Sequence, residues 1–453
     1  MAQKSAYEID MLHGAIFPKY VRFCLPLALS LMVQLLFNAA DVIVVGRFAG
    51  AEALAAVGST TSLVSLLVNF FGGLSTGVNI MVSREYASSR FEKVKKIVHT
   101  GIATAVLGGV VFGFLGALAA DKVLVLMKSP DNVIGMSTLY MRIYYIGLPA
   151  LIIYNFGAAV LRSVGDTRRP MMYLLLSGIV NAVLNLILVI PFKMGVAGVG
   201  IATSVSNYLS MILVIRALMK EDSCLKLGLS DIRFDTRIVK ELMQLGLPIA
   251  FQASLFSIAN IMIQSSVNSF GSVYMAGNAA ASSVESFQMA FCSANMNAVL
   301  TFVSQNVGAR KYGRARKIFY SMMLYGVIIV QIISLVFILA RRPLLSLYNP
   351  DPEVIDVGAR RMFVAMAFAF GEITMDSYSN LQRGFGHTVE PMITSLLGAC
   401  AFRAVWLATV FRMYPYYEVI IAVWPVSWLL TTAAHFFVSR KILRKYPRED
   451  VEI

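Results

Sequence analysis

One ionisable residue stands inside an apolar stretch that is long enough to cross a bilayer. Residues 26–46 read PLALSLMVQLLFNAADVIVVG and contain Asp41 together with the amides Gln34 and Asn38. The three polar residues are spaced four and three apart, so they share one helix face. A charged aspartate facing lipid would cost roughly 2.5 to 3.5 kcal/mol, so Asp41 is expected to face the protein interior or a wet cavity as part of a functional site. The alternative is a residue near the helix end that caps or pairs locally.

Three further polar residues are expected at the depth of Asp41. If the first predicted helix runs outward, Asn185 lies in the outer half of the fifth predicted helix (170–190), and Asn181 lies one turn below it. Thr203 lies in the outer half of the sixth predicted helix (196–218). Oxygen ligands of this kind suit a hard cation such as Na+, for which Asp41, Asn181 and Thr203 are the expected ligands, whereas a partly buried carboxylate suits a proton. The alternative is an amide network that only packs helices, worth about 0.6 kcal/mol per contact.

The second half of the chain has its own membrane acids. Glu372 and Asp376 are four residues apart and share a helix face, and Arg403 is expected at a similar depth in the next helix. We predict a buried ion pair between Glu372 and Arg403, because pairing lowers the cost of placing both charges in the membrane. We expect this pair to have a structural role, so that Asp376 is the acid more available for coupling.

Two prolines could bend the helices that begin each half of the chain. Pro26 and Pro248 lie early in predicted helices, within the matching segments LPLA and LPIA. A proline inside a helix removes a backbone hydrogen bond and bends the helix, whereas one in the first turn is tolerated. Both readings stay open.

The composition predicts the elements that must position these residues. Of the 453 residues, 58% are hydrophobic and 14% are charged, and the mean hydropathy is +0.71, which is typical of an all-α integral membrane protein crossing the bilayer many times. Twelve apolar segments of spanning length are separated by short loops. They are residues 20–45, 54–80, 97–120, 136–160, 170–190, 196–218, 241–268, 276–303, 316–340, 357–382, 392–411 and 417–439.

The second half of the sequence repeats the first. VSREYASSRFEKVKKI from Val82 matches VSQNVGARKYGRARKI from Val303, and RSVGDTRRPM from Arg162 matches RGFGHTVEPM from Arg383. Each repeat holds an even number of spans, so the halves have the same orientation and form two six-helix bundles related by a parallel pseudo-twofold axis. The expected division is an N-terminal bundle at 1–218, a cytoplasmic linker at 219–240 and a C-terminal bundle at 241–453.

The net charge of +14 does not indicate nucleic acid, because most Lys and Arg residues lie in alternate loops, on the side of the N-terminus. This bias places both termini in the cytoplasm of a multi-pass protein of the plasma (inner) membrane. No removable signal peptide is expected. Four scattered cysteines and four scattered histidines favour neither a disulfide framework nor a metal cluster, and no cofactor is expected.

The stretch 26–46 with Gln34, Asn38 and Asp41, the paired loops after Arg162 and Arg383, and the double repeat resemble the multidrug and toxic compound extrusion (MATE) transporters over essentially the whole chain. The resemblance implies export of organic cations or other amphipathic compounds by alternating access, driven by inward movement of Na+ or protons. It is closest to the DinF-like branch, which implies that Asp41 is the main coupling acid and that Asn181 and Thr203 belong to its site.

Two departures from the family pattern concern coupling. Members of this branch commonly carry an aspartate where this chain has Asn185, and other branches carry an acid in the seventh helix, where FQASLFSIAN from Phe251 has none. Coupling through the second bundle would therefore rest on Glu372 or Asp376.

Two other classes of function compete with an antiporter. A flippase for amphipathic lipids or lipid-linked sugars is the first alternative, although such proteins often have extra spans and a cleft rich in positive charge. A membrane-embedded enzyme is not expected, because HExxH and clustered catalytic His and Asp residues do not occur. The expected partners are small amphipathic or cationic substrates and membrane lipids, and the expected state is a monomer.

Overall fold

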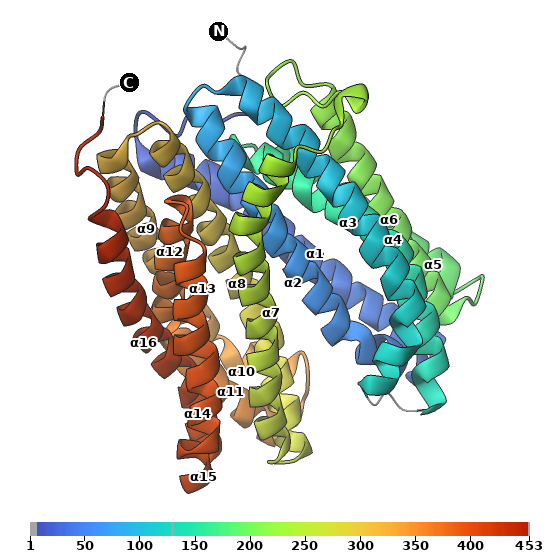
Figure 1. Cartoon of the computed structure of the whole chain (residues 1–453). Coiled ribbons are helices and arrows are strands. Elements are labelled where there is room, and N and C mark those ends of the chain that lie inside the picture. The colour runs from blue at the N-terminus through green and yellow to red at the C-terminus, as the bar shows by residue number, and fades with distance from the viewer. Residues whose placement is uncertain (1–6, 128–130, 452–453) are drawn as a thin grey trace. The chain divides into compact units, whose positions relative to one another are not determined.

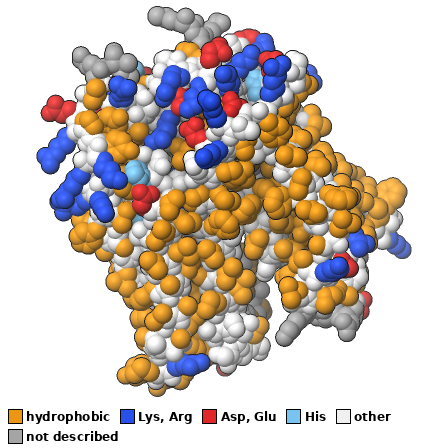
Figure 2. All heavy atoms as spheres, viewed as in Figure 1, with side chains coloured by type: hydrophobic (Ala, Val, Ile, Leu, Met, Phe, Trp, Pro, Cys, Tyr) orange, Lys and Arg blue, Asp and Glu red, His pale blue; other side chains and the backbone are white. Residues whose placement is uncertain are grey.

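The computed structural model describes residues 7–127 and 131–451, and every regular element in them is helical. The expectation of an all-α fold is therefore confirmed for this part of the chain. Ten of its helices are long and apolar enough to cross a membrane. On the face shown in Figure 2, hydrophobic side chains cover the helices along their length, and Lys and Arg side chains gather toward the helix ends. This distribution is the one that a lipid bilayer selects.

The first half of the chain forms six long helices (Figure 1). They are α1 (Ile16–Val44), α2 (Ala51–Ala87), α3 (Phe91–Leu126), α4 (Asp131–Ser163), α5 (Arg168–Val189) and α6 (Gly195–Met219). A π-helical turn, η1 (Val45–Ala49), follows α1, and a short 3-10 turn, η2 (Leu229–Asp231), lies between α6 and the next helix. The central helix is α4, which packs against α2, α3 and α6.

The helices of the second half are interrupted more often than the sequence predicts. Its helices are α7 (Thr236–Asn268), α8 (Ser272–Gly308), α9 (Tyr312–Leu339), α10 (Arg341–Ser346), α11 (Pro352–Ala367), α12 (Ala369–Gly384), α13 (Val389–Ser395), α14 (Phe402–Ala408), α15 (Val410–Met413) and α16 (Tyr417–Leu443). The expected span 357–382 is divided into α11 and α12 at Phe368, and the expected span 392–411 contains a π-helical segment, η3 (Leu396–Ala401). A hydropathy pattern counts apolar residues and does not detect such interruptions.

Residue contacts divide the chain into two compact units. The first unit contains the chain from Leu29 to Leu247 with the described residues up to Ile9, and the second contains residues Asp10–Ala28 with the described chain from Pro248 onward. The chain passes from one unit to the other between Ala28 and Leu29, inside α1, and between Leu247 and Pro248, inside α7. The first of these positions is close to Pro26. The predicted division at 1–218, 219–240 and 241–453 stays a prediction.

The positions of Pro26 and Pro248 settle one open alternative. Both prolines lie well inside their helices, because α1 begins at Ile16 and α7 begins at Thr236. The alternative that each proline occupies a first helical turn is therefore wrong. Whether either proline bends its helix stays a prediction.

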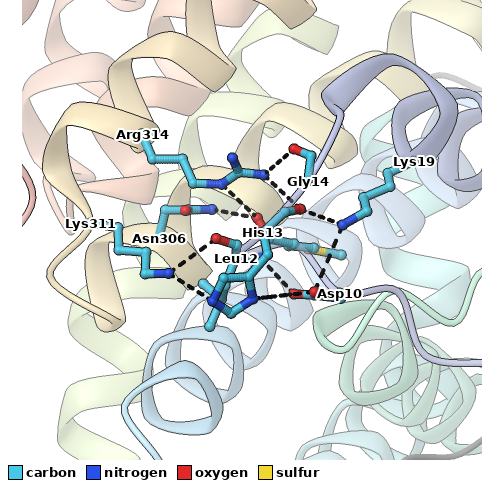
Figure 3. Close-up of polar contacts among 9 residues, drawn as sticks. Asp10, Leu12, His13, Gly14, Lys19, Asn306, Lys311 and Arg314 are labelled. Atoms are coloured by element: carbon cyan, nitrogen blue, oxygen red, sulfur yellow. Dashed lines mark hydrogen bonds and ion pairs between the residues drawn. The ribbon is translucent and has the colours of Figure 1, made fainter.

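The N-terminal segment of the second unit is held against the end of α8 and the start of α9 (Figure 3). Arg314 donates to the carbonyls of His13 and Gly14 at 2.9 and 3.0 Å, and Asn306 donates to the carbonyl of Met11 at 3.1 Å. From the C-terminal side, Asp450 accepts a hydrogen bond from the Arg314 backbone at 3.0 Å. Residues 11–14 and 450 therefore lie at the same end of this unit, as expected for an even number of spans.

Candidate ion-coupling site

Asp41 of α1 is hydrogen-bonded to α5 inside the first unit. The side-chain amide of Asn185 donates to Asp41 Oδ1. The amide of Asn181 is best oriented with its nitrogen toward Asp41, where it lies 2.9 and 3.3 Å from the two carboxylate oxygens. In this orientation Asn181 Oδ1 accepts from the backbone N–H of Thr203 in α6 at 3.3 Å. The structure thus brings Asp41, Asn181, Asn185 and the backbone of Thr203 together.

These contacts bear on one of the two readings of Asp41. Its partners come from α5, far away in the sequence, and not from the end of its own helix. The alternative that Asp41 caps or pairs locally is therefore wrong. The coupling role of Asp41 and its neighbours stays a prediction.

The buried stripe of α5 explains why the two asparagines meet Asp41. Ser177, Asn181, Asn185 and Val189 are buried and are each four residues apart, so they lie along one face of the helix. Asn185 is fully buried and Asn181 is 6% exposed. Three of these four residues are polar, although α5 is otherwise apolar enough to span a membrane. Such a stripe needs a polar partner, and Asp41 supplies it.

A glycine permits the close approach of α1 to α5. A Cβ atom added at Gly178 would lie 2.1 Å from the ring of Phe37, which is far inside van der Waals contact. Phe37 belongs to α1, one turn before Asp41. The missing side chain of Gly178 therefore allows the ring to pack where the two helices bring Asp41 to Asn181 and Asn185.

One buried carbonyl oxygen remains without a partner. Asn185 Oδ1 has no hydrogen-bond partner among the described residues, although the residue is fully buried. A buried acceptor without a partner costs about 1–3 kcal/mol, so this oxygen is available to a cation or to a proton donor beside Asp41.

The structure adds one residue to this neighbourhood and separates two others from it. Tyr140 of α4 is buried and lies close enough to Asp41 for their charges to interact. Sequence reasoning missed it, although the aromatic cluster YMRIYY in a predicted span was a visible signal. Gln34 and Asn38 are exposed, and no contact with Asp41 is found for either in the part of the chain that the structure describes.

The predicted ion pair between Glu372 and Arg403 is not formed. Arg403 donates to Ser427 Oγ at 3.1 Å and to Asn260 Oδ1 at 3.3 Å. It lies close enough to Glu372 for their charges to interact, but no contact within ion-pair distance joins them in the described residues. The prediction assumed a regular helix before Arg403, whereas the π-helical segment η3 directly precedes α14 and changes the direction in which later side chains point.

Asp376 is likewise not in an ion pair. The nearby Arg383 donates to Asn380 Oδ1 at 3.2 Å and to Gln252 Oε1 at 2.9 Å. Both acids therefore remain candidates for a second coupling site without a salt-bridge partner among the described residues.

A different ion pair is buried in the second unit. Arg361 of α11 contacts Glu285 of α8 through two hydrogen bonds of 3.1 and 2.7 Å, donates to the carbonyl of Asn278 at 3.2 Å, and lies over the ring of Trp424 at 4.7 Å. Sequence reasoning assigned no partner to Arg361, inside the expected span 357–382, and passed over Glu285. The acid inside the predicted span 276–303 was the signal that could have revealed the pair.

Comparison with known proteins gives the context of this site. The MatE family model matches residues 26–187 and 248–407. The probable multidrug resistance protein YoeA of Bacillus subtilis is 27% identical, over 92% of this chain and 93% of that protein. The FAD transporter of Shewanella oneidensis is 24% identical, over 73% of this chain and 74% of that protein.

Solved structures show the same fold. The structure described as the outward-facing conformation of a multidrug resistance MATE family transporter of the MOP superfamily has a TM-score of 0.90 and 19% sequence identity, and the match covers 98% of this chain and 99% of that one. This likeness confirms the predicted fold of twelve transmembrane helices in two bundles.

Proposed function

Because the chain belongs to the MatE family of multidrug efflux transporters, we propose that it is a secondary active transporter that exchanges organic cations or other amphipathic compounds for H+ or Na+. Alternating access would move the substrate outward while the ion moves inward. We also propose that it is a multi-pass protein of the plasma membrane and that both of its termini lie in the cytoplasm. In this proposal the transporter acts as a monomer and uses no cofactor. Its partners are small substrates and membrane lipids.

One observation carries the coupling part of this proposal. Asp41 lies in an apolar helix, and two buried amides of α5 reach its carboxylate. A carboxylate in such surroundings is costly to insert, which supports a functional role for it. The same carboxylate can take up a proton while both amides stay in place.

The orientation of the amides favours a proton as the coupling ion. Asn181 and Asn185 both direct N–H groups at Asp41, whereas a hard cation needs oxygen ligands. Of the two asparagines, Asn185 offers an unpartnered oxygen atom, Oδ1, without a turn of its amide. Na+ binding would require the Asn181 amide to turn its oxygen toward Asp41 and to give up the contact with Thr203. We therefore propose H+ before Na+.

The test is efflux from proteoliposomes with an imposed proton gradient, an imposed sodium gradient, or neither. The substrate panel contains a fluorescent organic cation and also FAD, because one relative is named a FAD transporter. The variants are Asp41→Asn and Asp121→Asn, which makes the same chemical change at an exposed position of α3. We expect the proton gradient to drive efflux in the wild type and in Asp121→Asn, and Asp41→Asn to abolish it. Normal gradient-driven efflux by Asp41→Asn would contradict the coupling role of Asp41.

A further inference from the structure

A pocket rich in arginine lies at one end of α9 and α16, within the second unit. Its volume is about 460 Å³. The lining residues are Arg316, Arg440, Leu443, Arg444, Tyr446 and Arg448. We call it the arginine pocket. In Figure 2, the Lys and Arg side chains at the upper left lie over this end of the unit. Arg440 belongs to the last turn of α16, Arg444 caps that helix, and Arg448 lies beyond it.

Arg316 fixes the shape of the pocket. It donates to the carbonyls of Leu443 and Tyr446 at 2.8 and 3.1 Å, and also to that of Pro447. These are carbonyls at and just beyond the end of α16, which have no partner inside the helix. Because Arg316 belongs to α9, it holds the segment after α16 against α9. The pocket is therefore a built feature of the fold.

The wall formed by Tyr446 is also anchored. Its ring lies 4.9 Å from that of Phe385 and 5.4 Å from that of Tyr312. Its hydroxyl donates to the Phe385 carbonyl at 3.2 Å. Aromatic contacts and a hydrogen bond thus hold the ring from two sides, so the space in front of it is kept open.

The positive charge of the pocket is poorly compensated. In residues 7–127 and 131–451, none of the ion pairs involves Arg440, Arg444 or Arg448. Arg448 lies close enough to Arg316 for the two charges to repel each other. The nearby Asp450 accepts its hydrogen bond from the Arg314 backbone. Like charges gathered in this way favour the binding of an anion.

The position of the pocket indicates the source of that anion. Both α9 and α16 are candidate membrane spans, so a pocket at their ends lies at the depth of the lipid headgroups. One turn from Arg316 and from Arg440, toward the middle of each span, the exposed side chains are aromatic: Tyr320 is 49% exposed and Phe437 is 67% exposed. An anionic group with an apolar tail fits both parts of this surface.

We propose that the arginine pocket binds the phosphate group of a phosphate-bearing ligand, with an anionic phospholipid as its source. Guanidinium groups match phosphate oxygens through paired hydrogen bonds, and basic pockets between membrane helices bind anionic headgroups. This site is separate from Asp41, which lies in the other unit, and the inference does not depend on the transported substrate.

The experiment measures binding to the purified full-length chain in detergent by native mass spectrometry and by the shift in melting temperature. The probes are dioleoylphosphatidylglycerol, dioleoylphosphatidylcholine and inorganic phosphate. The test variant carries Arg440→Gln, Arg444→Gln and Arg448→Gln. A control variant with the same loss of charge carries Arg47→Gln, Lys122→Gln and Arg412→Gln, which are exposed and lie elsewhere.

We expect one phosphatidylglycerol to bind the wild type and the control more tightly than phosphatidylcholine. Binding to the test variant should be about a hundredfold weaker, because each basic residue near an anionic headgroup adds about 1 kcal/mol. If inorganic phosphate displaces the lipid, the pocket recognises the phosphate group alone, and the source can be a soluble phosphate. If inorganic phosphate has no effect, the lipid is the ligand.

Equal binding of phosphatidylglycerol by the wild type and the test variant would overturn the proposal, as would equal binding of the two lipids by the wild type. Should the test variant fail to fold, the single change Arg448→Gln serves instead, because Arg448 is exposed and lies outside α16. For that variant we expect about a fivefold loss of affinity, corresponding to one basic residue.

Discussion

Asn185 of α5 donates a hydrogen bond to the carboxylate of Asp41 in α1, across 144 residues of sequence. Asn185 is an amide, whereas an aspartate at this position would place a second carboxylate beside Asp41. Here the position supplies a hydrogen-bond donor to the carboxylate and keeps one unpartnered oxygen, Oδ1.

The change Asn185→Asp places a second carboxylate beside Asp41. It replaces an N–H donor with oxygen ligands, which hard cations prefer. We expect efflux by this variant to be stimulated by Na+, measured in proteoliposomes at constant pH. The matched control is Asn132→Asp, the same change at an exposed position near the start of α4. Identical sodium responses of Asn185→Asp and the wild type would show that residue 185 does not select the ion.

The change Gly178→Ala tests the approach of α1 to α5. The new Cβ would collide with the ring of Phe37, so the helices must separate near Asp41. We expect a loss of about 1–3 kcal/mol in stability, as for other overpacked sites, together with slower efflux. Melting in detergent and the efflux assay measure these effects. Adding Phe37→Leu should restore part of both, and a double variant no better than Gly178→Ala would exclude this contact as the cause.

Removing one partner of the buried pair in the second unit should destabilise the protein. Arg361→Ala leaves the partly buried Glu285 without its partner, and breaking a buried pair in this way costs up to about 3–5 kcal/mol. The neighbouring Arg360 is exposed and pairs with Glu418 at 2.6 Å, so Arg360→Ala should cost about 1 kcal/mol or less. Thermal melting of the two variants in detergent compares them directly. A similar melting temperature for both would contradict the burial of the Arg361 pair.

Cys224 gives a prediction about pH. It lies in the loop after α6, where burial, with a further contribution from Glu8 and Glu221, raises the pKa of its thiol to about 11. Only the thiolate reacts with alkylating reagents, so at pH 8 its thiolate fraction is about a hundredfold below that of an ordinary cysteine. We expect alkylation of Cys224 to accelerate about tenfold per pH unit from pH 8 to 10. A rate that levels off near pH 9 would show an unperturbed thiol. Mass spectrometry of the Cys224 peptide gives the rate.

The sequence was most informative where a pattern repeats or where polarity is out of place. The double repeat predicted two bundles, and Asp41 in an apolar run pointed to Asn181 and Asn185 through the depth of each residue along its helix. Depth along a helix does not determine the direction of a side chain. For this reason Arg403 was paired with Glu372, although it contacts Ser427 and Asn260.

The remaining features depend on packing between segments that are distant in sequence. The break at Phe368 and the π-helical segment η3 change no residue type that a hydropathy pattern registers. Arg361 stands near a predicted loop, and only the fold shows that it is buried against Glu285. The membership of Asp10–Ala28 in the second unit also follows from contacts that no local pattern contains.

The most direct test of exchange at Asp41 is proton release on substrate binding. An organic cation is added to the purified protein in weakly buffered detergent solution, and the pH change is recorded for the wild type, Asp41→Asn and Asp121→Asn. If substrate and proton exchange through Asp41, the wild type and Asp121→Asn release protons in proportion to the substrate bound, and Asp41→Asn binds substrate without release. Equal proton release by Asp41→Asn and the wild type would contradict the account.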